Sequence, residues 1–340
     1  MVNGKEAMVQ EFVLHRIGAS EAESVISDHS AVLEGMEEQE FLRKLLLRPF
    51  STAVHTCEFD HKKGAGKGVL HKLCTDVEDG EDLVAVSAGI ARHLLRAAEQ
   101  HTVRGGDLFV VKFSGVELGN AAYNGVGIYK FDDKEVFIES AAKGGAIAMK
   151  LRRGLGTIKP SKACLVLFTD DDCTLFTIDG PGDTGFWQRD FIGLRAKRDH
   201  VNSTSNVLDL TKSFITEQLP QDYEIAKADQ IDLLNRSVQY FKSHSEFDKD
   251  EFAKEVFQDE GAIRSFDRYS HRFQEEHAVE LEDGFEISPQ AVKRQARVFK
   301  SVLKLDKNFH IYIHGDRNKI EHGVDEQGRK FYKIYYEQES

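Results

Sequence analysis

The chain has 340 residues, enough for two domains with separate cores, and carries 45 Lys and Arg against 57 Asp and Glu, a formal net charge of −12. Hydrophobic residues make up 41% and charged residues 30% of the chain, a balance typical of soluble globular proteins. No apolar run is long enough to predict a membrane span, and the N-terminal MVNGKEAMVQEF lacks the features of a signal peptide, so we expect a cytoplasmic protein.

The acidic balance and the few cysteines narrow the function classes further. A net negative charge repels nucleic acid at long range, so any contact with it needs a local basic patch. Four cysteines without a secretion signal do not indicate a disulfide framework, and we expect reduced thiols. The cysteines are Cys57, Cys74, Cys164 and Cys173.

Two amphipathic helices are predicted in the first hundred residues. Residues 37–50 place Leu42 and Leu46 on one face, and Pro49 ends the segment. Residues 81–100 repeat apolar side chains at the same helical spacing. Both segments therefore have an apolar side that can pack against a core.

A series of short strands is predicted next. The segments are rich in Val, Ile and Phe and are bounded by Gly or Asp turns. Most gaps between neighbours are too short for crossover helices, which favours an antiparallel meander. The predicted strands are residues 107–115, 125–133, 134–141, 163–171 and 173–180.

The polar segment RAKRDHVNSTSN, residues 195–206, has little periodicity and indicates a linker or boundary. Helical periodicity then dominates the chain. Asp248, three residues before Glu251, forms a capping-box pattern, and Ser288 with Pro289 predicts another helix start. The helical segments are residues 229–244, 247–258, 261–277 and 287–305.

Three histidines near the C-terminus lie in FHIYIHGDRNKIEHG, residues 309–323. Apolar and polar side chains alternate from Phe309, which predicts a strand, and residues 324–337 supply a partner strand after a glycine turn. His310 and His314 share a face, but their backbones are separated by roughly 13 Å at ~3.3 Å per residue. That separation favours a structural hairpin over a metal site.

The fold prediction is therefore an α+β protein. A mixed N-terminal domain with an antiparallel sheet spans residues 1–200. A mostly helical C-terminal domain spans residues 207–340 and ends in a β-hairpin.

Two other clusters contain residue types that bind metals. One set has spacings that do not fit paired zinc ligands, and a strand running into a basic loop is the simpler interpretation. A second set of carboxylates, between Asp170 and Asp183, could serve a metal-dependent nuclease, although Asp is common in turns and successive strand residues point to opposite faces. The first set is His55, Cys57, His61, His71 and Cys74, and the second is Asp170, Asp171, Asp172, Asp179 and Asp183.

Two basic segments are candidates for phosphate contacts. KLRRGLGTIKPSK, residues 150–162, contains no acidic residue. In the predicted last helix, cations recur at spacings of four, three and four beside an apolar stripe, so they share one face. Such a stripe can neutralise a row of phosphates, whereas the alternative is a solvated face paired with acidic residues. The candidates are Lys293, Arg297, Lys300 and Lys304, then Arg152, Arg153 and Lys159 in the first segment, which also holds Lys150 and Lys162.

Several stretches resemble the bacterial nucleoid-associated protein family (NdpA-like). The C-terminal run 299–339 is similar to the end of that family, and FWQRDFIGLRAKRDHVNSTSNVLDL, residues 186–210, to its middle. VLHRI and FLRKLLLRPF are similar to its opening. The resemblance implies a cytoplasmic bacterial protein of the compacted chromosome, with nucleic-acid binding as the family's role and no catalytic residues.

The favoured function is non-enzymatic binding of DNA, or RNA, with little sequence preference, through the candidate cations. One alternative is an adaptor that a DNA-bound protein partner recruits to the nucleoid. The other is the metal-dependent nuclease. We expect no cofactor, no bound metal and no membrane contact.

Overall fold

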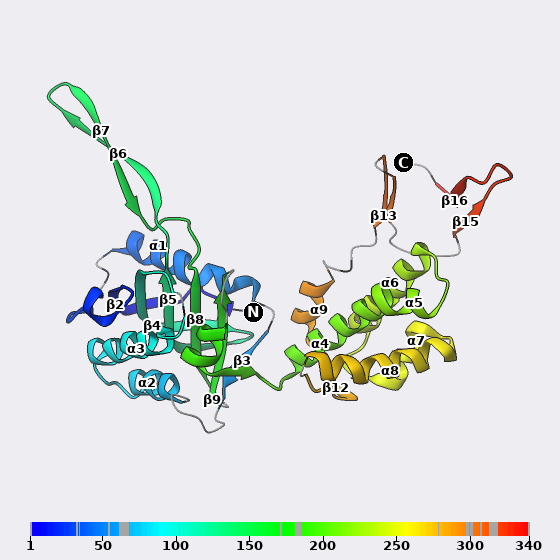
Figure 1. Ribbon diagram of the computed structural model, residues 1–340, viewed down its shortest axis with the longest axis horizontal. Helices are drawn as coiled ribbons and strands as arrows, with labels where there is room; N and C mark the ends of the chain where they lie inside the picture. The colour runs from blue at the N-terminus through cyan, green and yellow to red at the C-terminus, as the bar shows by residue number, and fades with distance from the viewer. Residues whose placement is uncertain are drawn as a thin grey trace. The chain divides into compact units, whose positions relative to one another are not determined.

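The computed structural model describes residues 2–31, 33, 35–53, 55–60, 68–101, 103–170, 172–180, 185–277, 279–296, 299, 302–306, 308–312 and 319–338 (Figure 1). The chain divides into two compact units, Met1–Lys197 and Arg198–Ser340. It is an α+β protein with an antiparallel sheet and a C-terminal hairpin, which confirms the predicted class. No helix in the described part of the chain is both long enough and apolar enough to cross a membrane.

The described residues of unit 1 form an eight-stranded antiparallel sheet in the order β1-β4-β5-β8-β9-β3-β10, with β2 also paired to β4. The predicted meander is confirmed in the consecutive neighbours β4, β5, β8 and β9. The strands are β1 (Val2–Asn3), β2 (Met8–Ile17), β3 (Cys57–Phe59), β4 (Gly106–Leu118), β5 (Ala121–Phe131), β8 (Lys162–Thr169), β9 (Asp172–Asp179) and β10 (Leu194–Ala196).

Both faces of this sheet are covered, because successive strand residues point to opposite sides and the central strands are apolar throughout. Along β4, Val110 lies in the core shared with α2 and α3, and Val111 lies in the core shared with α1. Trp187, in a short π-type helix, is buried in the first of these cores. The helices are α1 (Met36–Leu47), α2 (Val69–Glu78) and α3 (Leu83–Ala98), with helical turns at Glu21–Glu23, Arg48–Thr52 and Phe186–Ile192.

The two predicted N-terminal helices are confirmed as α1 and α3. The strand predicted before the basic loop is confirmed as β3, the loop residues 61–67 lie outside the described residues, and the unpredicted helix α2 begins at Val69. Leu70, Cys74 and Val77 occur at helical spacing in α2 and are buried against the sheet. Packing of this apolar side against the sheet stabilises α2, although the sequence before the helix is polar and rich in glycine.

Two strands of unit 1 leave the main sheet and form a separate ribbon, β6 (Glu135–Lys143) paired with β7 (Ala146–Gly154). Figure 1 shows this ribbon extending away from the sheet and its helices. The strand predicted at residues 134–141 is therefore confirmed, but it pairs outside the meander. The turn between β6 and β7 has Gly144 and Gly145 at φ +57° and +81°, which only glycine adopts at little cost.

Unit 2 is mostly helical around an aromatic core that includes Phe214, Phe252 and Phe266. Two predicted helix starts are confirmed. The Asp248 side chain accepts a hydrogen bond from the N–H of Glu251 at 2.8 Å, and Ser288 Oγ accepts one from Ala291 N–H at 3.4 Å. The elements are α4 (His200–Ser213), a π-type turn Phe214–Gln218, α5 (Leu219–Asp222), α6 (Lys227–Ser243), β11 (Glu246–Asp248), α7 (Lys249–Phe257), α8 (Glu260–His277), β12 (Gly284–Glu286) and α9 (Pro289–Gln295).

The polar segment 195–206 is only partly irregular, because α4 begins at His200 with Asp199 as its N-cap. Thr204 and Ser205 are buried in this helix. Their hydroxyls donate to backbone carbonyls four residues earlier, at 2.7 and 2.9 Å, so burial leaves no donor unsatisfied. Polar composition alone therefore gave the wrong structure for the second half of the segment.

The predicted helix 287–305 is too long, since α9 ends at Gln295. Residues Val302–Leu305 form β13, which pairs with β14 (Phe309–Tyr312) and is thus the true partner of the histidine strand. Leu303 packs with Ala228 and Ile231 of α6 and with Ile320, so tertiary contacts override the helical pattern.

The C-terminal hairpin is confirmed, but its first strand is β15 (Ile320–Val324), paired with β16 (Lys330–Ile334). Gly328 closes its turn at φ +78°. His310 is exposed on β14 and His322 lies on β15, in a different two-stranded sheet. His314 lies outside the described residues.

Candidate nucleic-acid interface

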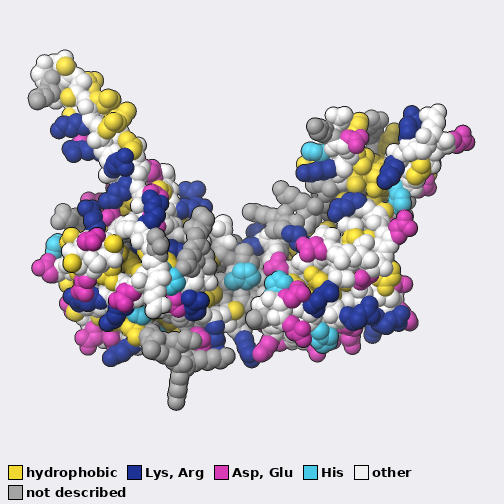
Figure 2. Space-filling view, in the orientation of Figure 1, with side chains coloured by type: hydrophobic (Ala, Val, Ile, Leu, Met, Phe, Trp, Pro, Cys, Tyr) yellow, Lys and Arg dark blue, Asp and Glu magenta, His cyan; other side chains and the backbone are white. Residues whose placement is uncertain are grey.

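The β6–β7 ribbon has two chemically different faces, because directly paired residues of antiparallel strands lie on the same side. The pairs Phe137–Arg152 and Glu139–Lys150 form one side, which we call the basic face. The other side, the apolar face, consists of the pairs Val136–Arg153, Ile138–Leu151, Ser140–Met149 and Ala142–Ile147. Figure 2 shows hydrophobic side chains along the ribbon and Lys and Arg toward its base.

The basic face keeps its positive charge available to solvent. Arg152 contacts Glu139 through Nε at 2.7 Å, but both side chains are about half exposed, at 53% and 51%. Such surface pairs contribute ~0–1 kcal/mol, so a phosphate can replace the carboxylate. The ribbon Glu135–Gly154 holds four basic and two acidic residues, a net charge of +2 in a chain of −12.

The second acidic residue of the ribbon, Glu135, accepts hydrogen bonds at the base of the ribbon. It accepts a hydrogen bond from the N–H of Thr157 at 2.6 Å and another from the N–H of Ile158. These bonds fix the loop that follows β7. They also remove the negative charge of Glu135 from competition with phosphate, because a carboxylate bonded to backbone donors is already stabilised.

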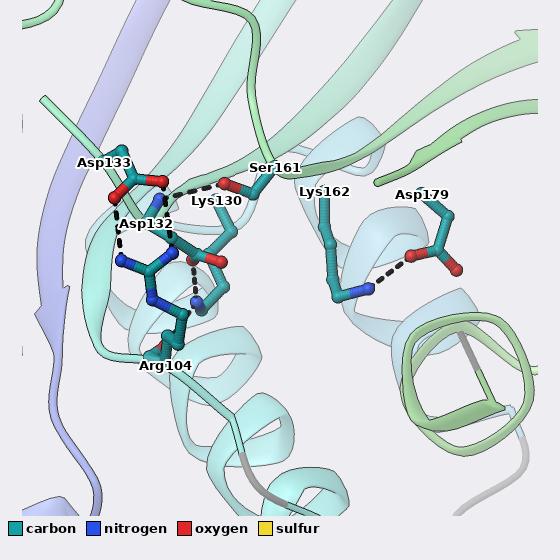
Figure 3. A network of polar contacts seen from close by, with 7 residues as sticks. All are labelled: Arg104, Lys130, Asp132, Asp133, Ser161, Lys162 and Asp179. Atoms are coloured by element: carbon teal, nitrogen blue, oxygen red, sulfur yellow. Dashed lines mark hydrogen bonds and ion pairs between the residues drawn. The ribbon is translucent and has the colours of Figure 1, made fainter. Parts of the chain in front are cut away.

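A polar network anchors the two ends of the ribbon to the sheet (Figure 3). The buried Lys130 ammonium donates to the carbonyl of Arg104 at 2.6 Å and to the carboxylate of Asp132. Asp132 N–H donates to Ser161 Oγ at 3.1 Å, and Ser161 N–H donates to the carbonyl of Lys130 at 2.9 Å. Arg104 also binds both carboxylate oxygens of Asp133, at 2.8 and 3.2 Å.

This network ties the segment that leaves β5 to the segment that enters β8, so the base of the ribbon is fixed in position. Burial lowers the pKa of Lys130, and the hydrogen bond that its ammonium donates to Asp132 opposes that effect. The network therefore compensates for a cation placed at 0% side-chain exposure.

Lys162, part of the basic sequence segment, does not belong to the surface patch. It is buried and forms an ion pair with Asp179, its partner in the β8–β9 register (Figure 3). Its ammonium also lies 5.0 Å from the ring centroid of Phe186. The role of Lys162 is structural, and Asp179 is likewise occupied.

Lys159 is exposed beside the base of the ribbon and lines a surface hollow with Lys44 and Arg48 of the α1 region. Lys44 pairs with Glu40 on its own helix. No sequence pattern joins these cations to Lys159, since more than a hundred residues separate them. The fold thus adds two basic residues to the edge of the ribbon segment.

The four cations predicted on one helix face are not on one helix. Lys293 is exposed on α9, and Lys304 is exposed on β13 opposite His310. Arg297 and Lys300 lie outside the described residues. The helical stripe is therefore a wrong prediction, because α9 ends at Gln295.

The residues that could bind metals are largely occupied or separated. His71 Nε2 lies 3.5 Å from Asp172 Oδ1, and ligand atoms of His71, Asp172 and Cys173 lie within 4.8 Å of one another. Burial raises the pKa of the Cys173 thiol to about 12, which opposes formation of a thiolate ligand. Burial also raises the pKa of the Cys74 thiol.

The other members of both sets that the structure describes do not join this group. His55 is exposed, and Asp179 is engaged with Lys162. His61, Asp171 and Asp183 lie outside the described residues. A further group, His244 with Glu251 and Glu255 on unit 2, also supplies three ligands, whereas structural zinc sites have four. Within the described residues the Asp cluster does not converge as a two-metal nuclease requires.

A family model described as nucleoid-associated protein YejK matches residues 13–337. None of the curated proteins and none of the solved structures matches the chain. The match covers nearly the whole sequence, so the chain belongs to this family, in agreement with the resemblance noted from its sequence. The family is not an enzyme family, and membership implies a cytoplasmic location at the bacterial nucleoid.

Proposed function

We propose that this chain, a member of the nucleoid-associated protein YejK family, binds duplex DNA with little sequence preference, chiefly through the basic face of its β6–β7 ribbon. The observation that carries the proposal is a net positive ribbon on an otherwise acidic chain. A two-stranded ribbon has the width that the major groove of B-DNA accepts. Exposed Lys and Arg on it would contact phosphates, which position a protein without reading sequence.

The proposed contacts fall into two sets. The first set, on unit 1, is the more strongly supported, because its members lie on the ribbon or beside its base. The second set lies on unit 2, where the structure describes only two of its four members, both exposed. The first set is Lys150, Arg152 and Lys159 with Lys44 and Arg48, whereas Arg153, also a candidate from the sequence, lies on the apolar face; the second set is Lys293 and Lys304 with Arg297 and Lys300 outside the described residues.

Ribbon geometry favours DNA over double-stranded RNA as the ligand. The major groove of A-form RNA is deep and narrow, so a β-ribbon does not enter it. We therefore expect duplex RNA to compete weakly against duplex DNA of the same length. Equal competition by the two duplexes would indicate that the protein contacts the phosphate backbone outside the groove.

The test is a salt titration of DNA binding by a variant of the basic face, Lys150→Gln with Arg152→Gln. Each lost phosphate contact reduces the slope of log K against log salt by about 0.9, so we expect a decrease of up to ~2 and a much lower affinity at about 50 mM salt. A short mixed-sequence duplex and fluorescence anisotropy suffice.

The matched control removes two exposed arginines from acid pairs elsewhere, Arg92→Gln and Arg264→Gln. It changes the net charge by the same amount, so it separates the local patch from the field of the whole molecule. We expect its salt slope to match the wild type. A wild-type protein without measurable affinity at low salt would refute direct binding and favour the adaptor, and an unchanged slope in the ribbon variant would remove the ribbon from the site.

A further inference from the structure

The apolar face of the ribbon is covered by no other part of unit 1 that the structure describes. Its five large aliphatic residues are exposed to solvent by 57% to 80%. A contiguous apolar patch of this size on a soluble protein often marks a functional contact. The exposed residues are Val136, Ile138, Ile147, Met149 and Leu151.

The stripe is fixed by the register of the ribbon. The Gly144–Gly145 turn sets which residues pair, and a slip of one residue would move every aliphatic side chain to the opposite face. A two-stranded ribbon is also only marginally stable by itself in water. Both facts indicate that this face is built to be covered.

We propose that the apolar face of the β6–β7 ribbon packs against the same face of a second copy of this chain, in a two-fold symmetric dimer. The proposal goes beyond DNA binding and does not depend on it, because the apolar and basic faces point in opposite directions. Two-fold dimers, in which one patch meets itself, are the commonest assemblies of soluble proteins.

The area of the stripe supports a second copy as the occupant. Burial of an aliphatic side chain removes about 60–120 Å² from water, so five side chains that are about two-thirds exposed offer roughly 200–400 Å² per copy. Two facing ribbons, with the backbone and Ser140 and Ala142 between the large residues, then approach the ~1,000 Å² total that a specific interface needs.

The shape of the stripe is also complementary to itself. Near the turn, the β7 side carries the large Ile147 and Met149, and the β6 side carries their small partners Ala142 and Ser140. A two-fold axis along the ribbon places β7 of one copy over β6 of the other. Large side chains then lie over small ones, which is how close packing between layers is achieved.

Charge does not oppose this contact. The apolar face carries one ionisable residue, Arg153, at its end beside the sheet, and no carboxylate. Under the same two-fold axis each Arg153 lies over Val136 of the other copy, so the two guanidinium groups lie at opposite edges of the paired ribbons. The acidic surface of unit 1 stays at the base, outside the contact.

The test measures oligomeric state by sedimentation equilibrium of the full chain without DNA, from submicromolar to high micromolar concentration. We expect a dimer whose dissociation constant rises about a hundredfold or more in Met149→Ser with Leu151→Ser, because four buried side chains are lost per dimer. The matched control, Met36→Ser with Val324→Ser, removes apolar residues that are 90% and 63% exposed away from the ribbon and should leave dimerisation unchanged.

A second variant, Ala142→Trp, keeps the test decisive if serine weakens the ribbon. Tryptophan favours strands and is exposed at this position in a single copy, so it should preserve the ribbon but clash with Ile147 of the facing copy. We expect the dissociation constant of the dimer to rise tenfold or more, because the tryptophan overpacks the contact. A wild-type monomer at every concentration, or a dimer insensitive to both ribbon variants, would overturn the proposal, and neither result would bear on the salt titration with DNA.

Discussion

Acid sensitivity of unit 1 should depend on one buried imidazole, that of His15 on β2. This side chain shares a strand face with Val13 and Ile17, which lie in the core. Its Nδ1 accepts a hydrogen bond from the N–H of Ser27 at 3.0 Å, so Nδ1 must be unprotonated. Burial, together with the charge of Arg92, lowers the pKa of His15 from 6.5 to about 4.

The size of the effect follows from proton linkage. The unfolded chain takes up a proton near pH 6.5, and the folded state does so only near pH 4. Neutral His15 thus contributes stability that is present above pH 6.5 and is lost as the pH falls toward 4, up to about 3 kcal/mol. Between about pH 7.5 and about pH 5 the expected loss is about 2 kcal/mol.

The measurement is the free energy of unfolding of unit 1 in urea at these two pH values. Trp187 is the single tryptophan of the chain and is buried in unit 1, so its fluorescence reports on this unit. The variant His15→Asn keeps an acceptor for Ser27 N–H but does not titrate. We expect its loss of stability on acidification to be smaller than that of the wild type by about 2 kcal/mol.

A residual pH dependence should remain in His15→Asn, because burial also lowers the pKa of His93. The reasoning is refuted if His15→Asn loses as much stability as the wild type between the two pH values. A His93 variant would then be the next to measure. His93 Nε2 lies 2.8 Å from the carbonyl oxygen of Phe191, so that substitution also removes a hydrogen bond.

Two further substitutions test the base of the ribbon and a helix start. Lys130→Met leaves the carboxylate of Asp132 without its buried partner, and the free energy of unfolding of unit 1, read by Trp187 fluorescence, should fall by about 3 kcal/mol. A variant as stable as the wild type would show that the network does not anchor the ribbon. Asp248→Ala removes the N-cap of α7 and should cost unit 2 about 1 kcal/mol in chemical unfolding followed by circular dichroism, whereas Asp248→Asn should cost much less. Equal losses in both variants would contradict the capping role.

Local sequence patterns predicted the elements whose own residues show which side is buried. β4 and β8 are continuous apolar runs, and α3 has one apolar side, so each was predictable from composition and period. β7 was missed because AIAMKLRRG is rich in Ala, Lys and Arg, which disfavour strands. Its strand conformation depends on pairing with β6, and the residues of the segment do not by themselves predict that pairing.

The candidate site shows the same limit. The sequence located the basic segment around Arg152, but it could not show that Lys162 turns inward, because its partner Asp179 becomes a neighbour only through the β8–β9 register. Spacing likewise predicted Lys293 and Lys304 on one helix. Lys304 lies instead on β13, where its neighbour Leu303 packs against α6. Side-chain periodicity cannot report such distant contacts.

The length of the ribbon bears on how an acidic protein can approach a polyanion at all. A strand of nine residues spans about 30 Å at ~3.4 Å per residue, and Lys150 stands about 13 Å out from the last residue of β7. In physiological salt, electrostatic forces decay over about 8 Å. A duplex held by the middle of the ribbon would therefore lie beyond most of the repulsion from the acidic body, so the ribbon serves as a spacer that lets a small local charge outweigh a larger distant one.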